Sequence, residues 1–264
     1  MSVGQPNTLP HGCPADVMAA EGEVRRANLQ GLHVIAKDPD LAFRHFSEAF
    51  TLATDGAGAL SADSRAQRRA LAATENNLGL FYHTVGRDEA AESHLLRACD
   101  LERELGSDAP SPAVTLLNLA QVQLRLGGRR EAQALLTLTE ALRLVDAALG
   151  ARDLLPHEAT KMVRIGARAC VTRGEALLKR NEFDSSAKSF VRASQLYTKL
   201  GMPEDLVKAE KYNRLSRKVA AGNAKPSLLE AAVRSESVYR GAPAASRRPA
   251  SAAVSRRPLA ADAP

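Results

Sequence analysis

The chain of 264 residues contains no tryptophan, and aromatic residues of all kinds make up only 4% of it. Runs of β-branched residues are also scarce, whereas alanine, leucine, arginine and glutamate are abundant. Such residues favour helices over strands, and small side chains allow helices to pack closely. The composition therefore predicts an all-α protein and argues against a sheet protein.

Cysteine and long apolar runs are also rare. The three cysteines, Cys13, Cys99 and Cys170, lie far apart and form no Cys-x-x-Cys pair, which argues against a disulfide framework and a zinc knuckle. No apolar run approaches the roughly 20 residues needed to span a bilayer. Residues 1–14 lack the basic and apolar segments of a secretory signal. We therefore expect reduced cysteines and a cytoplasmic or cytoskeletal location.

Motifs for catalysis, nucleotide binding and metal binding are missing as well. The sequence has no His-Glu-x-x-His, Gly-x-Ser-x-Gly, P-loop or Gly-x-Gly-x-x-Gly pattern. None of the six histidines lies three or four residues from another His or Cys with an acid in a metal-ligand arrangement. We therefore expect no enzyme activity, no small-molecule substrate, no metal and no cofactor.

Charge is distributed unevenly along the chain. Residues 205–264 carry 12 Lys or Arg and 5 Asp or Glu, a balance of +7, whereas residues 1–204 carry 24 and 25, a balance of −1. The body is thus neutral and the tail basic. From residue 241 onward Ala, Pro, Ser and Arg predominate, and such a segment cannot bury a core. We expect residues 241–264, like residues 1–14, to be disordered.

The sequence does contain an internal repeat of small and large residues. In its clearest copy, the small residue Gly79 is followed by Tyr82, Gly86, Ala91, Leu95 and Ala98. Three further copies follow the same spacing in whole or in part, and their first small position falls at Gln30, Ala120 and Gly174.

Each position of this spacing has a role in a helical hairpin. The first small residue allows two antiparallel helices to approach closely, and the glycine at the position of Gly86 ends the first helix. A second small residue marks the next crossing, and a large residue one helical turn further on fills the space between hairpins. These two positions hold Ala42 and Phe46, Ala91 and Leu95, Ala132 and Leu136, and Ser186 and Phe190. A single hairpin cannot bury its apolar face, so neighbouring hairpins must stack.

The repeat therefore predicts an α-solenoid of about four hairpins in residues 15–221, closed by a polar capping helix at its C-terminal end. The step from Ala132 to Ser186 is longer than the step from Ala91 to Ala132, so we expect an irregular loop or a lengthened helix around residues 148–157. Residues 222–240 show the pattern of one further amphipathic helix.

The spacing resembles that of tetratricopeptide repeat proteins. Their usual first-helix tryptophan is replaced here by Arg26, Glu75, Leu116 and Cys170. The step from Gly79 to Ala120 is longer than the standard repeat of about 34 residues. Residues 70–140 in particular resemble the repeats of kinesin light chains, which share a lengthened second helix and an asparagine before the small residue. The resemblance implies a protein–protein interaction scaffold or adaptor.

The same resemblance implies a site. In the kinesin light chain type, that asparagine points into the concave groove of the first helices and bonds the backbone of an extended peptide. Here the position holds Asn28, Asn77 and Asn118, with Thr172 in the last copy. An asparagine amide offers both a donor and an acceptor, which suits a peptide bond. The alternative is that these asparagines bond the neighbouring hairpin. Helical spacing adds the groove residues Asn76, Leu80, His83, Gln121, Arg125, Arg168 and Lys179, a mildly basic set that favours a neutral or acidic peptide.

Two other modes of binding are a carboxylate clamp and a contact through the basic tail. The carboxylate clamp that grips chaperone C-termini is not expected, because its positions hold Ala27, Leu80, Val114 and Asn118. A second function class stays open, in which the basic C-terminal tail contacts an acidic polymer such as nucleic acid, a tubulin tail or an anionic membrane, with steep salt dependence. Nucleic acid is disfavoured, since the tail lacks aromatic residues for base stacking apart from the nearby Tyr239.

Overall fold

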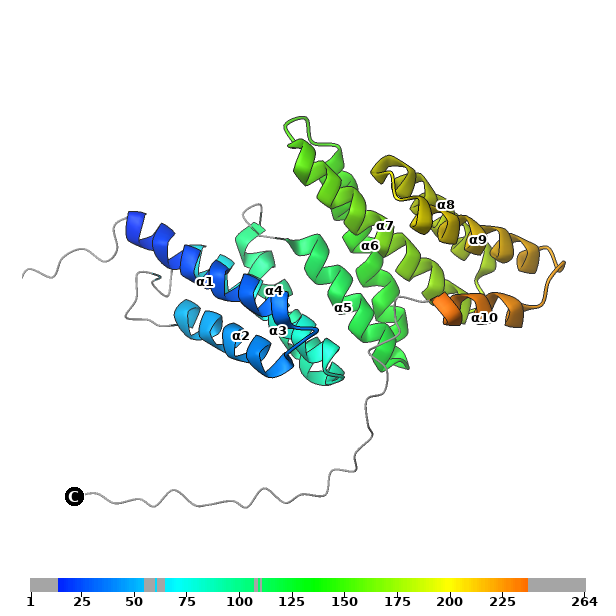
Figure 1. The fold of residues 1–264 in the computed structure, drawn as a ribbon. Helices are drawn as coiled ribbons and strands as arrows, with labels where there is room; N and C mark the ends of the chain where they lie inside the picture. Colours follow the sequence, from blue (N-terminus) through cyan, green and yellow to red (C-terminus); the bar gives the residue numbers. More distant parts are fainter. Residues whose placement is uncertain (1–13, 55–59, 61–64, 107–108, 110, 237–264) are drawn as a thin grey trace, which may run out of the picture.

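The computed structural model describes residues 14–54, 60, 65–106, 109 and 111–236, and this part of the chain is built from ten α-helices without a strand (Figure 1). The helices are α1 (Pro14–Val34), α2 (Pro39–Thr54), α3 (Arg65–Thr84), α4 (Asp88–Leu105), α5 (Pro112–Leu126), α6 (Arg129–Leu149), α7 (Pro156–Lys179), α8 (Phe183–Leu200), α9 (Pro203–Ala220) and α10 (Pro226–Glu236).

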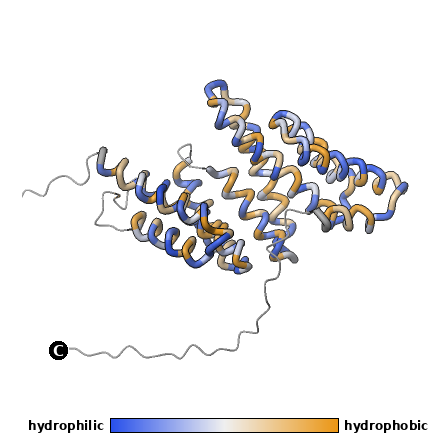
Figure 2. The backbone as a smooth tube through the Cα atoms, viewed as in Figure 1, coloured by the Kyte–Doolittle hydropathy of each residue, from blue (hydrophilic) through white to orange (hydrophobic). Residues whose placement is uncertain are grey.

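The helices form a stacked array of hairpins. Helices α1 and α2, α3 and α4, α5 and α6, and α7 and α8 pair within hairpins, and each second helix also packs against the first helix of the next pair. Contacts of α1 with α3, α3 with α5, and α5 with α7 place the first helices side by side on one face. Apolar and polar residues alternate along each helix, as expected when one stripe is buried (Figure 2). The predicted all-α solenoid is confirmed.

Turn residues end the first helices as the repeat predicts. Gly86 follows α3 with φ 81°, and Gly127 follows α5 with φ 70°. Both lie in the left-handed region, which glycine enters without a steric penalty. After α7 the corresponding residue is Asn181 with φ 60°, and asparagine is among the few other residues that tolerate this conformation.

A glycine of the first helix faces a large side chain of the second helix in three of the four hairpins. A Cβ atom added to these glycines would come closer than 3.0 Å to that side chain. All three large side chains are fully buried. The pairs are Gly31 with Phe46, Gly79 with Leu95, and Gly174 with Phe190.

The register of the first hairpin differs from the prediction by one residue. Gly31, not Gln30, meets Phe46, and Gln30 is exposed. His33, at the position that Tyr82 holds in the clearest copy, is also exposed, while Val34 packs beside Phe46. The reason is that the step from the crossing residue to the large residue is one position shorter here than the step from Gly79 to Leu95.

The register of the third hairpin differs from the prediction by two residues. Ala132 and Leu136, assigned to the interior, are exposed, and Leu136 is exposed by 65%. Ala134 and Leu138 are fully buried against Ala120 instead. A shift of two residues turns an α-helix by about 200°, so the predicted face points outward.

A buried ion pair replaces the missing tryptophan in the second hairpin. Glu75 is 4% exposed, and its carboxylate lies 2.5 Å from Nδ1 of His94 and 3.8 Å from Arg97. The His94 ring stacks on Tyr82 with centroids 5.0 Å apart and an angle of 7° between the planes. Polar and stacking contacts thus join α3 to α4 at a position that an aromatic side chain usually fills.

The C-terminal end of the array is capped by α9 and α10. Helix α9 packs against α8, while α10 packs against both α9 and α7. Leu229 of α10 is buried in a cluster with Leu178 and Tyr212. The disorder expected of residues 1–14 and 241–264 concerns residues outside the described part, except for Pro14, at which α1 begins. The last described helix, α10, extends to Glu236.

A buried carboxyl group lies at the joint between the second and third hairpins. Glu102, on the last turn of α4, is 4% exposed and accepts a hydrogen bond from the backbone N–H of Ser111, at 3.3 Å, just before α5. Its other oxygen is buried without a partner among the described residues. Burial raises the pKa of Glu102 to about 7, and hydrogen bonds from Thr115 and Ser111 offset this only in part.

The close crossing of α3 and α4 gives a first prediction. In a Gly79→Ala variant the new Cβ would lie 2.5 Å from Cγ of Leu95 and 3.3 Å from the carbonyl oxygen of Ala91. We expect a loss of about 1–3 kcal/mol of stability, measured by urea denaturation followed by circular dichroism. The control is Gly22→Ala in α1, where the new Cβ would meet nothing within 4 Å. It should gain about 0.5–1 kcal/mol. Equal effects of the two changes would contradict the packing role of Gly79.

The buried Glu102 gives a second prediction. The pKa of Glu102 is raised from 4.5 to about 7 on folding, so the folded state holds a proton between these pH values that the unfolded state releases. Stability should therefore fall as the pH rises from about 4.5 to 7, by on the order of 3 kcal/mol. Glu102→Gln, which cannot ionise, should flatten this slope in denaturation curves recorded at each pH. Glu140→Gln, at an exposed residue of α6 paired with Arg143, should keep the wild-type slope.

Candidate peptide-binding groove

A cavity of about 620 Å³ opens on the face formed by the first helices. Its walls come from α1, α3, the residue before α5, and α7, which are far apart in sequence. The lining residues are Glu21, Val24, Arg25, Asn28, Leu29, Leu32, Arg69, Ala70, Ala73, Asn77, Ser111 and Lys161. Apolar and polar groups thus face the same hollow, as in many binding sites.

Helical periodicity extends this surface beyond the cavity. On α3, Leu80 lies about two helical turns after Ala73 and therefore on the same face, and it is half-buried. On α5, Asn118 and Arg125 lie about two and about four helical turns after Ser111. Helical periodicity therefore places these predicted residues of α3 and α5 on the face that lines the cavity.

Helix α7 contributes a row of cations to the groove. Lys161 lines the cavity, and Arg168 and Lys179 follow it about two and about five helical turns later on the same face. All three side chains are exposed, and none forms an ion pair with another described residue. Lys161 donates only to the Ser111 hydroxyl, at 3.1 Å. Thr172 lies on the same face but is 3% exposed, so it offers a ligand little surface.

Four asparagines of the groove are joined by hydrogen bonds. Asn118 Nδ2 donates to Asn76 Oδ1 at 3.0 Å, and Asn77 Nδ2 donates to Asn28 Oδ1 at 2.9 Å. A longer contact of 3.5 Å joins Asn76 Nδ2 to Asn77 Oδ1. Asn28 Nδ2 donates in turn to the Thr74 hydroxyl at 2.8 Å. This chain of amides, which we call the asparagine ladder, links α1, α3 and α5.

The ladder bears on both roles considered for the asparagines, which are peptide binding and bonding between neighbouring hairpins. They do bond the neighbouring hairpins, and Asn28, Asn77 and Asn118 are only 5–8% exposed. Asn28 and Asn77 nevertheless line the cavity. Each primary amide carries two N–H groups, and the ladder uses one. The asparagines therefore hold first helices together, and each keeps one N–H group that the ladder does not use.

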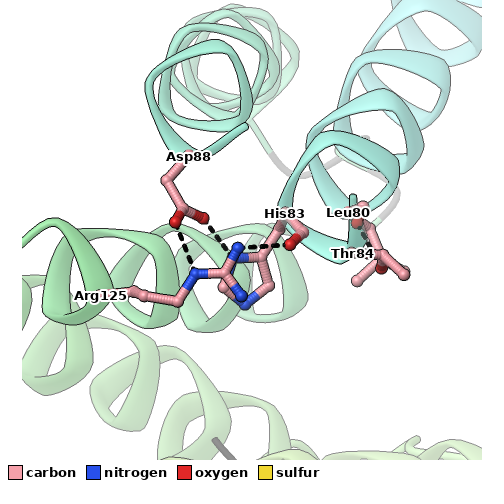
Figure 3. A network of polar contacts seen from close by, with 5 residues as sticks. All are labelled: Leu80, His83, Thr84, Asp88 and Arg125. Carbon is pink, nitrogen blue, oxygen red and sulfur yellow. Dashed lines mark hydrogen bonds and ion pairs between the residues drawn. The ribbon is translucent and has the colours of Figure 1, made fainter. Parts of the chain in front are cut away.

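His83 and Arg125 are tied into a network around Asp88 at the end of the groove (Figure 3). Asp88, in the first turn of α4, lies 2.8 Å from Nδ1 of His83 and 2.5 Å from Nε of Arg125. Arg125 also donates to the backbone carbonyl of His83, and the Thr84 hydroxyl donates to the carbonyl of Leu80 at 2.8 Å. Burial lowers the pKa of His83, although the hydrogen bond to Asp88 opposes this shift. This network mainly fixes α5 against the α3–α4 turn.

The remaining groove charges favour a negative ligand. Arg69 is paired with Glu21 at 2.8 Å and is therefore neutralised. Arg25 and Arg164 are exposed without a described ion-pair partner. Together with Lys161, Arg168 and Lys179 they give the groove a net positive surface. Gln121 is half-buried, and the structure shows no contact that assigns it a role.

The sequence prediction missed Thr74, Arg25 and Lys161. Thr74 and Lys161 act through residues 46 and 50 positions away in the chain, and only the stacking of helices brings these together. Arg25 lies one turn before Asn28, so helical periodicity from that asparagine could have found it.

The described residues contain no group of three or more His, Cys, Asp or Glu that could hold a metal ion. No helix in the described ranges is long and apolar enough to cross a membrane.

Comparison with known proteins places one match on this array. Residues 70–147, which include α4, α5 and most of α3 and α6, match the family model of the tetratricopeptide repeat. No curated protein and no solved structure matches the chain. Tetratricopeptide repeats are in general protein–protein interaction modules, and their all-helical folds are typically non-enzymatic scaffolds. The family match and the stacked helical hairpins together support a tetratricopeptide repeat protein.

Proposed function

We propose that the protein is an interaction scaffold that binds an extended, acidic peptide segment of a partner protein in the groove of its first helices. The observation that carries this proposal is the cavity in which Asn28 and Asn77 stand beside the cations Arg25 and Lys161. Amides suit a peptide backbone, and the unpaired cations suit carboxylates. The apolar lining residues Leu29 and Leu32 provide surface for one apolar ligand side chain.

The distribution of charge supports an acidic ligand over a neutral one. The exposed cations of α7 extend the positive surface from the cavity along the groove. A single exposed ion pair contributes only about 0–1 kcal/mol, so affinity must come from several contacts along an extended segment. An acidic segment would also be steered toward the groove before it docks.

The proposal extends to the repeat type and its boundaries. We assign the groove-bearing unit to residues 15–221 and the repeats to the kinesin light chain type. The support is the long step between Gly79 and Ala120 and the asparagines before the crossing residues. This assignment concerns the form of the repeat and implies no motor partner. A cytoplasmic or cytoskeletal location is part of the same proposal.

Charge reversal on α7 tests the acidic ligand. We expect peptides selected from a random displayed library on the full-length chain to be rich in Asp and Glu. The variant Arg168→Glu with Lys179→Glu should weaken their binding by at least about tenfold in fluorescence polarisation, because two attractive contacts become repulsive. Lys188→Glu, at an exposed lysine of α8 outside the groove face, is the matched control and should bind normally. Equal binding by both variants would exclude the α7 surface.

Loss of the asparagine amides tests the backbone contact. Asn118→Ala and Asn77→Ala should each weaken binding of the selected peptides by roughly fivefold to tenfold, the cost of one lost hydrogen bond. Asn77→Ala also removes the donor to Asn28, so its thermal stability must be measured in parallel. A fully folded Asn118→Ala protein with unchanged affinity would contradict the role of the amides.

A further inference from the structure

All hydrogen bonds of the asparagine ladder run in one direction. From α5 toward α1, each amide donates through its nitrogen to the oxygen of the next group. The last amide, Asn28, donates to the hydroxyl of Thr74. The Thr74 hydroxyl donates in turn to the backbone carbonyl of Ala70 at 2.9 Å. The direction matters to a ligand because an amide oxygen accepts a hydrogen bond, whereas an amide nitrogen donates one.

The single proton of Thr74 accounts for this direction. A hydroxyl group has one proton, and in Thr74 the carbonyl of Ala70 receives it. The Thr74 oxygen can therefore only accept from Asn28, which must turn its nitrogen toward α3. Thr74 is completely buried, so water cannot take over this role.

The orientation of Asn28 passes along the ladder. The Asn28 oxygen faces Asn77, so Asn77 must donate through its nitrogen. For the same reason Asn76 donates to the oxygen of Asn77, and Asn118 donates to the oxygen of Asn76. Asn118 is left with a carbonyl oxygen to which no described residue donates. At the cavity, the Asn28 oxygen accepts from Asn77 and the Asn77 oxygen accepts from Asn76, and both amides retain a second N–H group.

We propose that Thr74 is a positioning residue that fixes the hydrogen-bond polarity of the groove. It makes Asn28 and Asn77 donors, which receive carbonyl oxygens of the bound peptide. It makes Asn118 an acceptor, which receives a peptide N–H group. This inference rests on the proposed function, because it specifies which edge of a peptide backbone meets each asparagine.

The opposite polarity defines the alternative. If Thr74 donated to the oxygen of Asn28 instead of Ala70, every amide would reverse, and Asn118 would present its nitrogen to a ligand. The ladder and its reversed form contain the same number of hydrogen bonds between amides. Only the direction in which the Thr74 hydroxyl donates distinguishes them. Replacing Thr74 should therefore affect asparagines that it does not touch.

The first test needs no ligand and uses side-chain amide signals in NMR spectra of the full-length chain. In Thr74→Val, the signals of Asn28, Asn77 and Asn118 should all shift, whereas Thr74→Ser, which keeps the hydroxyl, should leave them near their wild-type positions. The matched control is Thr139→Val on α6, whose hydroxyl also donates to a carbonyl one turn earlier, at 2.8 Å, but contacts no amide. It should shift none of the three signals. A shift of Asn28 alone in Thr74→Val would overturn the proposal.

The second test measures affinity for the peptides selected from the library. Thr74→Val should weaken binding by about tenfold, as expected when one backbone contact is mismatched, while Thr74→Ser stays within about twofold of wild type. Replacing single peptide N–H groups by ester oxygens should identify one position whose loss costs affinity in wild type but not in Asn118→Ala. Absence of binding by wild type would refute the proposed function and leave the NMR result to decide the ladder. Normal binding by a folded Thr74→Val protein would overturn the polarity inference alone.

Discussion

The contact of a glycine on one helix with a large buried side chain on its partner is the interaction on which the array depends. Without a Cβ at Gly79, the backbone of α3 can lie directly against Leu95 of α4. The same arrangement recurs at Gly31 and Gly174. Close pairing within each hairpin lets the first helices of successive hairpins lie beside one another. The groove and its polar contacts follow from that placement.

Two kinds of interaction hold successive hairpins together. Across α1, α3 and α5 the asparagine ladder supplies directional contacts on the groove face. From α5 to α9 a single large apolar cluster joins the helices, and it includes Leu138, Ile165 and Tyr197. Between α5 and α7 the groove face includes a polar contact from Lys161 to the Ser111 hydroxyl. Apolar packing also joins the first hairpins, since Phe46 of α2 packs with Leu78 and Phe81 of α3.

The sequence was sufficient for the hairpins and insufficient for their register. Spacing of small and large residues predicts the helix pairs because each pair is a local structure. It misplaces Gln30 and Ala132 because the step between the crossing residue and its large partner differs from hairpin to hairpin, and a shift of one or two residues turns another face of the helix inward. For the groove, the pattern identifies Asn28, Asn77 and Asn118. It does not show that they bond one another, because Asn77 and Asn28 are 49 positions apart. Thr74 escapes notice because a threonine in a helix carries no recognisable signal.

The asparagine ladder also has a consequence for the shape of the solenoid. Its bonds run along the groove face, so any change in curvature of the first three hairpins must stretch or compress them. Hydrogen bonds lose strength steeply when their distance or angle changes. The ladder therefore resists bending of the first three hairpins along the groove face.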